Sequence, residues 1–367
     1  MLFQIYFVLL SRKHINNTII MKLYLIKKVK PLFILCLLSA AVVSKAAAKQ
    51  GDGLRAIGFY NVENLFDTTH DEGKLDQDFT PDGSYVWTEA KYRHKLGNMA
   101  KVLAEMATDK VGAGGCDIIG LAEVENDHVL SDLVAQEPLK SRGYKFCHIE
   151  GPDMRGIDCA LLYNPKKFKV RDVKLVPYVQ ILKKDSAFFT RGFLTVSGTY
   201  AGEHIAIVVC HLPSRASSSF YRCLGAKQVK ALCDSIVADA PKTKVIVMGD
   251  MNDDPMDKSM AEELRGRRNL QEVGDDDMYN PWWNDLAEGR GTMTYNGLPN
   301  LFDQILLSRS FVSDGDTTLK FADHEIFRRD YLINATGKFK GYTKRTYSGK
   351  TWLDGYSDHL PTIIYLR

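Results

Sequence analysis

Eight polar side chains, each at or near one end of an apolar run, offer a single kind of chemistry. They are carboxylates, amides and imidazoles from distant parts of the chain: Asn61, Glu123, His211, Asp250, Asn252, Asp303, Asp358 and His359. Carboxylate and amide oxygens prefer hard cations, so the set favours Mg²⁺ or Mn²⁺, and it also suits Ca²⁺. A hard cation beside water-orienting carboxylates and imidazoles is typical of phosphate-ester hydrolysis. The sequence has no HExxH, CxxC or GxSxG motif. Their absence argues against a histidine-based zinc site, a cysteine-based zinc or thioredoxin-like site, and a covalent serine nucleophile.

The apolar runs must place these side chains. Three of the runs end in a candidate residue: 118–122 before Glu123, 205–210 before His211, and 245–248 before the Gly-Asp-Met-Asn segment 249–252. A buried strand has no use for an unpaired terminal charge, so the repetition predicts strand ends that converge on one polar site. Asp303 instead begins its run, and an antiparallel neighbour would bring it to the same sheet edge.

Other segments complete an α/β pattern. Thr88 is the predicted N-cap of an amphipathic helix that ends near Met106, and Pro241 is predicted to end a second helix. Strands outnumber helices, and the order of the segments requires both parallel and antiparallel connections. The least regular stretch, 315–355, is basic and aromatic. It is either a solvated surface excursion or a surface that grips a polyanion.

Bulk composition limits the class of protein. The 367 residues are 45% hydrophobic and 25% charged, which is ordinary for a globular chain with a large core. The net charge of +3 comes from residues 1–46, which hold seven of the 48 Lys and Arg residues and no acid. The remaining chain is therefore acidic overall, so any basic footprint for nucleic acid must be local.

The N-terminus has the order of a secretory signal peptide. Residues 21–30 are basic, 32–43 are apolar and 44–48 offer small residues for cleavage. We predict a signal region over 1–46, with Met21 as an alternative start, and a single domain over 47–367. Export would place the protein in the periplasm or outside the cell; the alternative is a membrane anchor, for which the apolar stretch is short. Six cysteines follow, an even count that permits disulfides, although several lie in apolar runs typical of buried thiols.

Seven segments together resemble the endonuclease/exonuclease/phosphatase superfamily, which is DNase I-like. They are FYNVENLFD at 59–67, IIGLAEVEN at 118–126, RGIDCALLYNP at 155–165, VVCHLPSR at 208–215, VIVMGDMNDDP at 245–255, LFDQILLS at 301–308 and YSDHLP at 356–361. They stand in the superfamily's order, and the wording is most similar to exported bacterial nuclease-like members. The resemblance implies a four-layer α/β sandwich: two packed mixed, mostly antiparallel sheets with helices outside.

The resemblance also implies roles. Glu123 would be the principal metal ligand, with Asn61 and Asp358 near the same ion. Asp250 would orient or deprotonate the attacking water, and Asn252 would hold the phosphate.

Both histidines are expected to be catalytic, without a fixed direction of proton transfer. His359 would contact the phosphate while Asp303 holds its imidazole, and His211 would lie near the leaving group. Arg155 would bind phosphate or form a surface ion pair.

We therefore predict a Mg²⁺-dependent phosphodiester hydrolase that acts on DNA or RNA by in-line attack of water. The expected partner is nucleic acid. We expect a monomer, with no stable membrane insertion once the signal segment is removed. Two alternatives stay open: a phosphomonoesterase or sphingomyelinase-like phospholipid hydrolase on the same site, and a non-catalytic binding protein.

Overall fold

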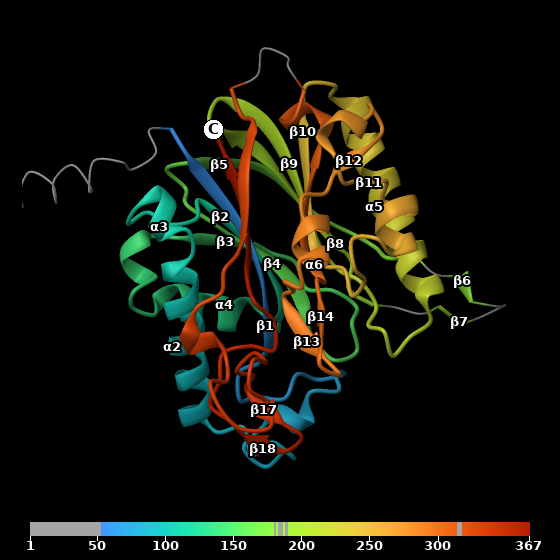
Figure 1. The fold of residues 1–367 in the computed structure, drawn as a ribbon. Helices are drawn as coiled ribbons and strands as arrows, with labels where there is room; N and C mark the ends of the chain where they lie inside the picture. Colours follow the sequence, from blue (N-terminus) through green and yellow to red (C-terminus); the bar gives the residue numbers. More distant parts are fainter. Residues whose placement is uncertain (1–52, 180, 183–185, 188–189, 314–317) are drawn as a thin grey trace, which may run out of the picture. The chain divides into compact units, whose positions relative to one another are not determined.

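Two β-sheets packed face to face form the centre of the molecule (Figure 1). The structure is a computed structural model that describes residues 53–179, 181–182, 186–187, 190–313 and 318–367. The predicted signal region, residues 1–46, lies outside these described residues.

The first sheet has six strands and carries both chain ends of the described region. Its order is β16 (Phe321–Ile326), β19 (Thr362–Leu366), β1 (Arg55–Leu65), β2 (Ile118–Val124), β4 (Asp158–Tyr163) and β3 (Lys145–His148). Only the pair β1–β2 is parallel, and the other neighbours are antiparallel. The parallel pair matters because the carboxyl ends of its two strands meet at one edge of the sheet.

The second sheet has seven strands. Its order is β11 (Gly266–Arg267), β12 (Met278–Tyr279), β15 (Asp303–Ser308), β10 (Lys244–Asp250), β9 (Glu203–His211), β8 (Phe193–Tyr200) and β5 (Phe168–Val176). The central pair β9–β10 is parallel, the short edge pair β11–β12 is also parallel, and the remaining pairs are antiparallel. Both sheets are thus mixed and mostly antiparallel, as predicted.

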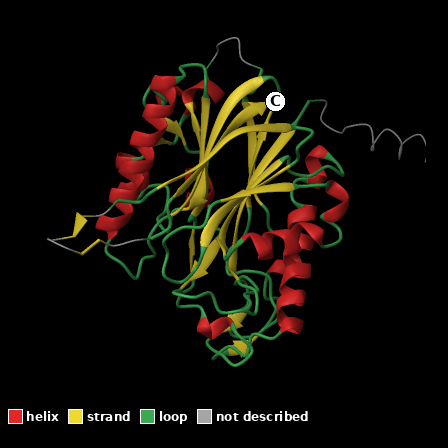
Figure 2. Cartoon of the chain, turned by 180° about the vertical axis from the view of Figure 1, so that it is seen from behind, coloured by secondary structure: helices red, strands yellow, loops and turns green. Residues whose placement is uncertain are grey.

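Helices cover the outer face of each sheet (Figure 2). The first sheet packs against α2 (Glu89–Glu105), α3 (Thr108–Val111) and α4 (Asp127–Ala135), and the second against α5 (Ser219–Asp239). Thr88 caps α2 as predicted, because its side chain accepts a hydrogen bond from the Lys91 N–H. The four layers of the predicted sandwich are therefore present.

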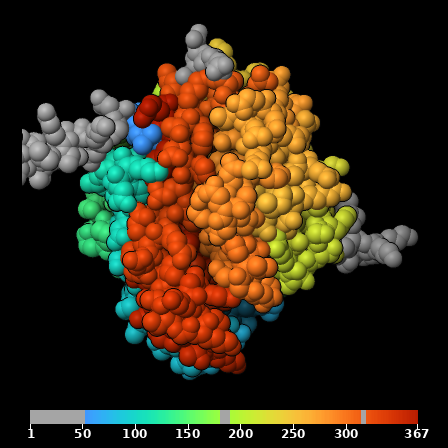
Figure 3. All heavy atoms as spheres, viewed as in Figure 1, coloured from blue at the N-terminus to red at the C-terminus, as the bar shows by residue number. Residues whose placement is uncertain are grey.

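Short elements decorate the ends of the sheets. They are α6 (Trp283–Ala287), the π-helical turn Ser259–Glu263, and the pairs β13 (Met293–Tyr295) with β14 (Leu298–Asn300), β17 (Tyr347–Ser348) with β18 (Thr351–Trp352), and β6 (Ile181–Leu182) with β7 (Ser186–Ala187). The C-terminal segment, red in Figure 3, lies beside the orange segment that carries α6, β13 and β14. Backbone hydrogen bonding joins them, since Leu360 N donates to Thr292 O at 2.7 Å.

The interior between the sheets is apolar and closely packed. Its side chains come from both sheets and include Ile57, Phe59, Ile118, Leu194, Ile207, Ile246, Met248 and Ile305. Gly120 of β2 faces Met248 of β10, and a Cβ at Gly120 would lie 2.5 Å from the Met248 sulfur. Glycine thus permits a close approach of the two sheets three residues before Glu123.

Candidate active site

One row of the second sheet carries three of the predicted residues. In the ladder, Asp250 of β10 pairs with His211 of β9 on one side and with Asp303 of β15 on the other. His211 and Asp250 end two parallel strands, whereas Asp303 begins an antiparallel one. The sequence rule that an acid at a strand start shares an edge with an acid at a strand end therefore applies here.

The first sheet supplies the facing groups. Asn61 lies in β1 and Glu123 near the end of β2, while Asp358 and His359 directly precede β19. Glu123 has φ 65° and sits at a register shift between β2 and β4. A left-handed conformation at a non-glycine residue costs about 1–3 kcal/mol and is kept where surrounding structure fixes it. Here the bulge turns Glu123 toward the second sheet.

Asn61 connects the two sheets. Its amide nitrogen donates to Asp250 Oδ2 at 3.0 Å and to Glu123 Oε1 at 3.3 Å. Its carbonyl oxygen accepts the Glu63 N–H at 2.9 Å. Asn61 is fully buried, so these bonds fix its orientation and with it the spacing of the two carboxylates.

His359 is held by two carboxylates. Its Nδ1 lies 2.7 Å from Asp303 Oδ2, and its Nε2 lies 3.7 Å from Asp250 Oδ2. Burial alone would lower the pKa of His359, but Asp303 and Asp250 raise it well above its ordinary value. The two carboxylates therefore favour the protonated form of this imidazole.

His211 has the opposite character. Its Nε2 lies 3.6 Å from Asp250 Oδ2 and 3.9 Å from Glu123 Oε1. Burial lowers the pKa of His211 well below its ordinary value, and the guanidinium groups of Arg191 and Arg155 add to this effect. The surroundings thus shift the pKa values of the two imidazoles beside Asp250 in opposite directions.

Asp250 lies between the two histidines. Burial raises the pKa of Asp250 to about 7, because the desolvation of its carboxylate outweighs the nearby His359 cation. Its Oδ1 accepts the backbone N–H of Asn252 at 2.9 Å. Asn252, with φ 51°, in turn donates its side-chain amide to Leu212 O at 3.0 Å.

Two groups of side chains could hold a metal ion. One contains Asp250, Asp303 and His359, whose ligand atoms lie within 4.8 Å of one another. In this group the imidazole already bonds Asp303 through Nδ1, and the surrounding carboxylates favour its protonated form, which does not bind a metal. The other is the predicted set around Glu123, whose carboxylate is partly exposed.

The other predicted metal ligands have competing partners. Asp358 Oδ2 forms an ion pair with Arg345 Nη2 at 3.0 Å, and Asp358 Oδ1 lies 3.8 Å from His359 Nε2. Asn61 presents its nitrogen, not its oxygen, to the carboxylates. Glu123 and Asp358 therefore offer the ligand oxygens that a hard cation needs, while Asn61 in this arrangement is a donor to Glu123 and Asp250.

Arg155 is half-exposed and lies two residues after Asp153, a carboxylate that connects it to the candidate site. Its Nε lies 3.7 Å from Asp153 Oδ1. The same carboxylate group binds the buried Arg191, whose Nη1 lies 3.0 Å from Asp153 Oδ2. Arg191 also donates to Leu212 O at 3.3 Å, the oxygen that accepts from Asn252. Arg191 thus supports the backbone beside His211, while the half-exposed guanidinium of Arg155 can meet an anion from solvent.

A charged network beyond the predicted residues was not recognised in the sequence. Arg345 bridges Glu63 and Asp358, with Nη2 distances of 2.9 and 3.0 Å. Burial raises the pKa of Glu63 to about 7, and burial lowers the pKa of Lys95 to about 8. Lys95 donates to Thr346 Oγ1 at 2.6 Å from the buried face of α2. The position of Lys95 on the apolar face of the predicted helix was the one feature of the sequence that could have indicated this network.

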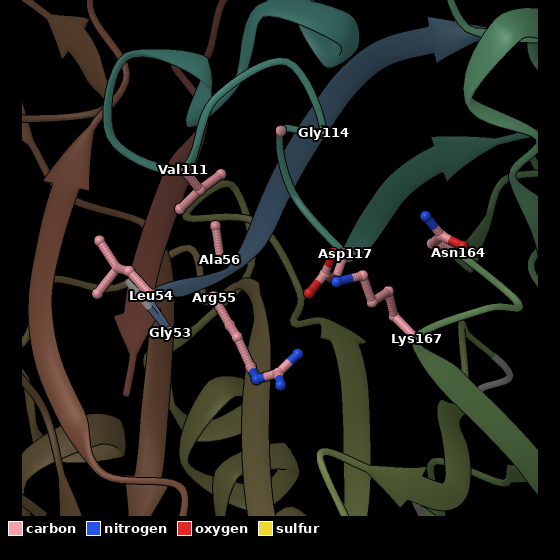
Figure 4. A pocket seen from close by; sticks show the side chains of 10 residues that line it. Gly53, Leu54, Arg55, Ala56, Val111, Gly114, Asp117, Asn164 and Lys167 are labelled. Carbon is pink, nitrogen blue, oxygen red and sulfur yellow. The ribbon is translucent and has the colours of Figure 1, made fainter. Parts of the chain in front are cut away.

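One of the pockets of the described structure lies away from this site. It lies at the start of β1 and is lined by Leu54, Arg55, Val111, Asp117 and Lys167 among others (Figure 4). Arg55 opens β1, and Asn61 lies roughly 20 Å further along the strand at about 3.3 Å per residue. The pocket is therefore at the opposite end of the strands from the polar centre.

The fold and the polar centre define a DNase I-like α/β sandwich. Residues 56–367 match the sequence profile of the Endonuclease/Exonuclease/phosphatase family, so the chain belongs to this family of phosphoric ester hydrolases. A search of characterised protein sequences gave no match.

Solved structures with a similar fold cover most of the chain. Humanized D. rerio TDP2 has a TM-score of 0.51 and 17% identity, covering 86% of this chain and 100% of that one. An endonuclease/exonuclease/phosphatase family protein from Bacteroides thetaiotaomicron has a TM-score of 0.51 and 16% identity, covering 85% and 94%. A mannosyl-6-phosphatase from the same organism has a TM-score of 0.51 and 15% identity, covering 85% and 99%. At these identities the likeness establishes the fold.

None of the helices in the described part of the chain has both the length and the hydrophobicity that a bilayer span requires.

Proposed function

We propose that the protein is an exported, Mg²⁺-dependent phosphodiesterase that hydrolyses nucleic acid. The observation that carries this proposal is the placement of Asp250 between two imidazoles, with its Oδ2 3.7 Å from His359 Nε2 and 3.6 Å from His211 Nε2. Phosphodiester hydrolysis needs a base for water, a cation for the phosphoryl oxygens and a group near the leaving oxygen. These three roles fall on three neighbouring side chains.

Asp250 orients the attacking water and takes its proton, because burial raises its pKa to about 7, which suits a general base. His359 donates to a phosphoryl oxygen through Nε2, while Asp303 on Nδ1 keeps the imidazole protonated and correctly turned. His211, neutral, lies on the other side of Asp250 and serves the leaving oxygen by hydrogen bonding.

The remaining groups bind and orient the substrate. Asn252 lies next to Asp250, to which its backbone N–H donates, and would hold the phosphate; Arg155, whose side chain is half-exposed, supplies a guanidinium that suits a phosphate. Glu123 and Asp358 would hold a divalent cation. When bound, such a cation neutralises charge that develops on the phosphoryl oxygens.

A polyanionic substrate is favoured by the surface beside the site. The segment that carries Arg345 also carries four exposed lysines, Lys338, Lys340, Lys344 and Lys350. Among the described residues none of the four forms an ion pair, so their charge is available to successive phosphates. D. rerio TDP2, which shares the fold, has been crystallised with a single strand DNA product. Export rests on residues 21–48, which lie outside the described region.

A phosphomonoesterase is the second candidate. The mannosyl-6-phosphatase with the same fold illustrates that the sandwich supports this chemistry. The four lysines distinguish the two proposals, because a sugar monophosphate has no use for an extended basic surface.

The test is turnover by the purified protein with Mg²⁺, with and without EDTA. The substrates are plasmid DNA, single-stranded RNA, bis-p-nitrophenyl phosphate and p-nitrophenyl phosphate. We expect EDTA-sensitive cleavage of a nucleic acid, and at least a 100-fold loss of kcat in Glu123→Gln, which removes the carboxylate charge but keeps its shape.

Glu262→Gln serves as the control, since Glu262 is exposed and lies outside the site. Full turnover by Glu123→Gln would contradict the metal assignment. Hydrolysis of the monoester alone would establish the second candidate in place of the first.

A further inference from the structure

A second group of carboxylates lies outside the candidate active site. Asp71 and Asp76 belong to the loop that follows β1, and Glu125 follows β2. One oxygen of each lies within 4.8 Å of the others. Asp76 and Glu125 are both only 2% exposed, and Asp71 is partly buried. Three carboxylates at this spacing repel one another unless a positive charge lies between them or one of them binds a proton, and burial raises the pKa of Glu125 to about 9.

Glu125 supplies an independent sign that a partner is missing. Its Oε2 accepts the Asp67 N–H at 2.7 Å, whereas its Oε1 is buried and has no hydrogen-bond partner among the residues that the structure describes. A buried carboxylate oxygen without a partner costs about 1–3 kcal/mol or more. Buried polar atoms of this kind ordinarily meet a donor, a water or a cation.

Protein cations compensate little of this charge. No Lys or Arg in the described ranges forms an ion pair with Asp71, Asp76 or Glu125, and His70 contacts Asp76 alone. Lys74, in the same loop, turns away and donates to Gly151 O at 3.0 Å. The nearest lysine therefore binds the neighbouring segment and leaves the carboxylates without it.

We propose that Asp71, Asp76 and Glu125 bind a Ca²⁺ ion at a site separate from the active centre. The donor set consists of oxygens only, which selects a hard cation. An irregular loop with carboxylates at differing depths suits the flexible coordination of Ca²⁺ better than the strict octahedron of Mg²⁺. The unpartnered Glu125 oxygen would complete the coordination.

The ion would connect the loop after β1 to the end of β2. The same loop contacts the segment of Arg155, because Leu75 N donates to Met154 O at 2.6 Å and Lys74 donates to Asp153 O at 3.3 Å. Ca²⁺ at this place therefore rigidifies the surroundings of Arg155. This effect on Arg155 rests on the proposed function, whereas the binding of Ca²⁺ itself does not.

The test measures thermal unfolding of the full chain, stripped with EDTA and then titrated with CaCl₂. We expect Ca²⁺ to raise the melting temperature by about 5 °C in the wild type. We expect the same rise in Glu72→Gln, a matched loop control whose side chain is exposed, and in Glu123→Gln. The rise should disappear in Glu125→Gln and in Asp76→Asn.

Asp71→Asn is a second variant that separates Ca²⁺ binding from a folding defect. Because Asp71 is partly exposed, its substitution should leave the melting temperature in EDTA unchanged. The same substitution should abolish the heat of Ca²⁺ binding measured by calorimetry. A full Ca²⁺ response in both Glu125→Gln and Asp71→Asn would overturn the proposal. So would loss of the response in Glu123→Gln alone, which would place the ion in the active centre. Failure of nucleic-acid cleavage, with the Ca²⁺ response intact, would contradict only the proposed function.

Discussion

At the scale of single residues, the two histidines of the candidate site differ because of their neighbours. Asp303 lies against His359 Nδ1, whereas His211 Nδ1 is buried without a partner. A carboxylate favours the imidazolium, and burial among arginines favours the neutral ring. Nothing in the identity of either residue distinguishes them, so the sequence left the direction of proton transfer open.

Asp303→Asn should separate the charge of His359 from its position. The amide can still bond the imidazole, but the main carboxylate that raises the pKa of His359 is gone. We expect a 10- to 100-fold fall in kcat, measured in steady-state kinetics on a phosphodiester. The alkaline limb of the pH–rate profile should move to lower pH, because the imidazolium loses its proton earlier.

The acidic limb has a different origin. Burial raises the pKa of Asp250 to about 7, so the base is protonated below that pH and the rate should fall as pH drops through a midpoint at or below about 7. In Asp303→Asn the midpoint of this acidic limb should shift only slightly. Asp239→Asn, at an exposed position on α5, should retain the wild-type profile; an unmoved alkaline limb in Asp303→Asn would refute the assigned role.

At the scale of elements, the close approach of β2 to β10 determines how the two halves of the site meet. Gly120→Ala would place a methyl group 2.5 Å from the Met248 sulfur. We expect a loss of about 1–3 kcal/mol in the free energy of unfolding, measured by urea denaturation, because the core must shift to accept it.

Gly97→Ala is the matched control for this prediction. Gly97 lies within α2, and a Cβ there would have no neighbour within 4 Å. Alanine in an open helix interior should stabilise the protein by up to about 1 kcal/mol. Equal effects of the two substitutions would show that the sheets tolerate a wider spacing than the structure indicates.

The sequence predicted the central strands well and the edge strands poorly. Buried strands such as β2, β9 and β10 are continuous apolar runs, and their ends were correct to within a few residues. The edge strands β5 and β16 alternate with exposed polar residues and were not recognised. The same limit hid Arg345, whose partners Glu63 and Asp358 are distant in sequence and meet only through tertiary packing.

At the scale of the whole molecule, the cysteines act as small apolar side chains. Cys116, Cys147, Cys159, Cys210, Cys223 and Cys233 are all free, and five of them are buried. The even count had permitted disulfides, but no pair is bonded within the described residues. Burial raises the pKa of several of these thiols, for example that of Cys233 to about 12, which keeps them unreactive.

A reducing agent should therefore leave the melting temperature unchanged, as measured by differential scanning calorimetry with and without dithiothreitol. Alkylation of the unfolded, unreduced protein should modify all six of these thiols, which mass spectrometry can count. A lower melting temperature after reduction, with fewer thiols modified before it, would reveal a disulfide.

The division of the candidate site between the two sheets has a consequence for the partly folded chain. Asp250, His211 and Asp303 come from one sheet, whereas Glu123, Asn61 and His359 come from the other. A chain in which only one sheet has formed holds half of the candidate site and is expected to be inactive. Activity should therefore appear only late in folding, because the candidate site is complete only when the two sheets have packed together.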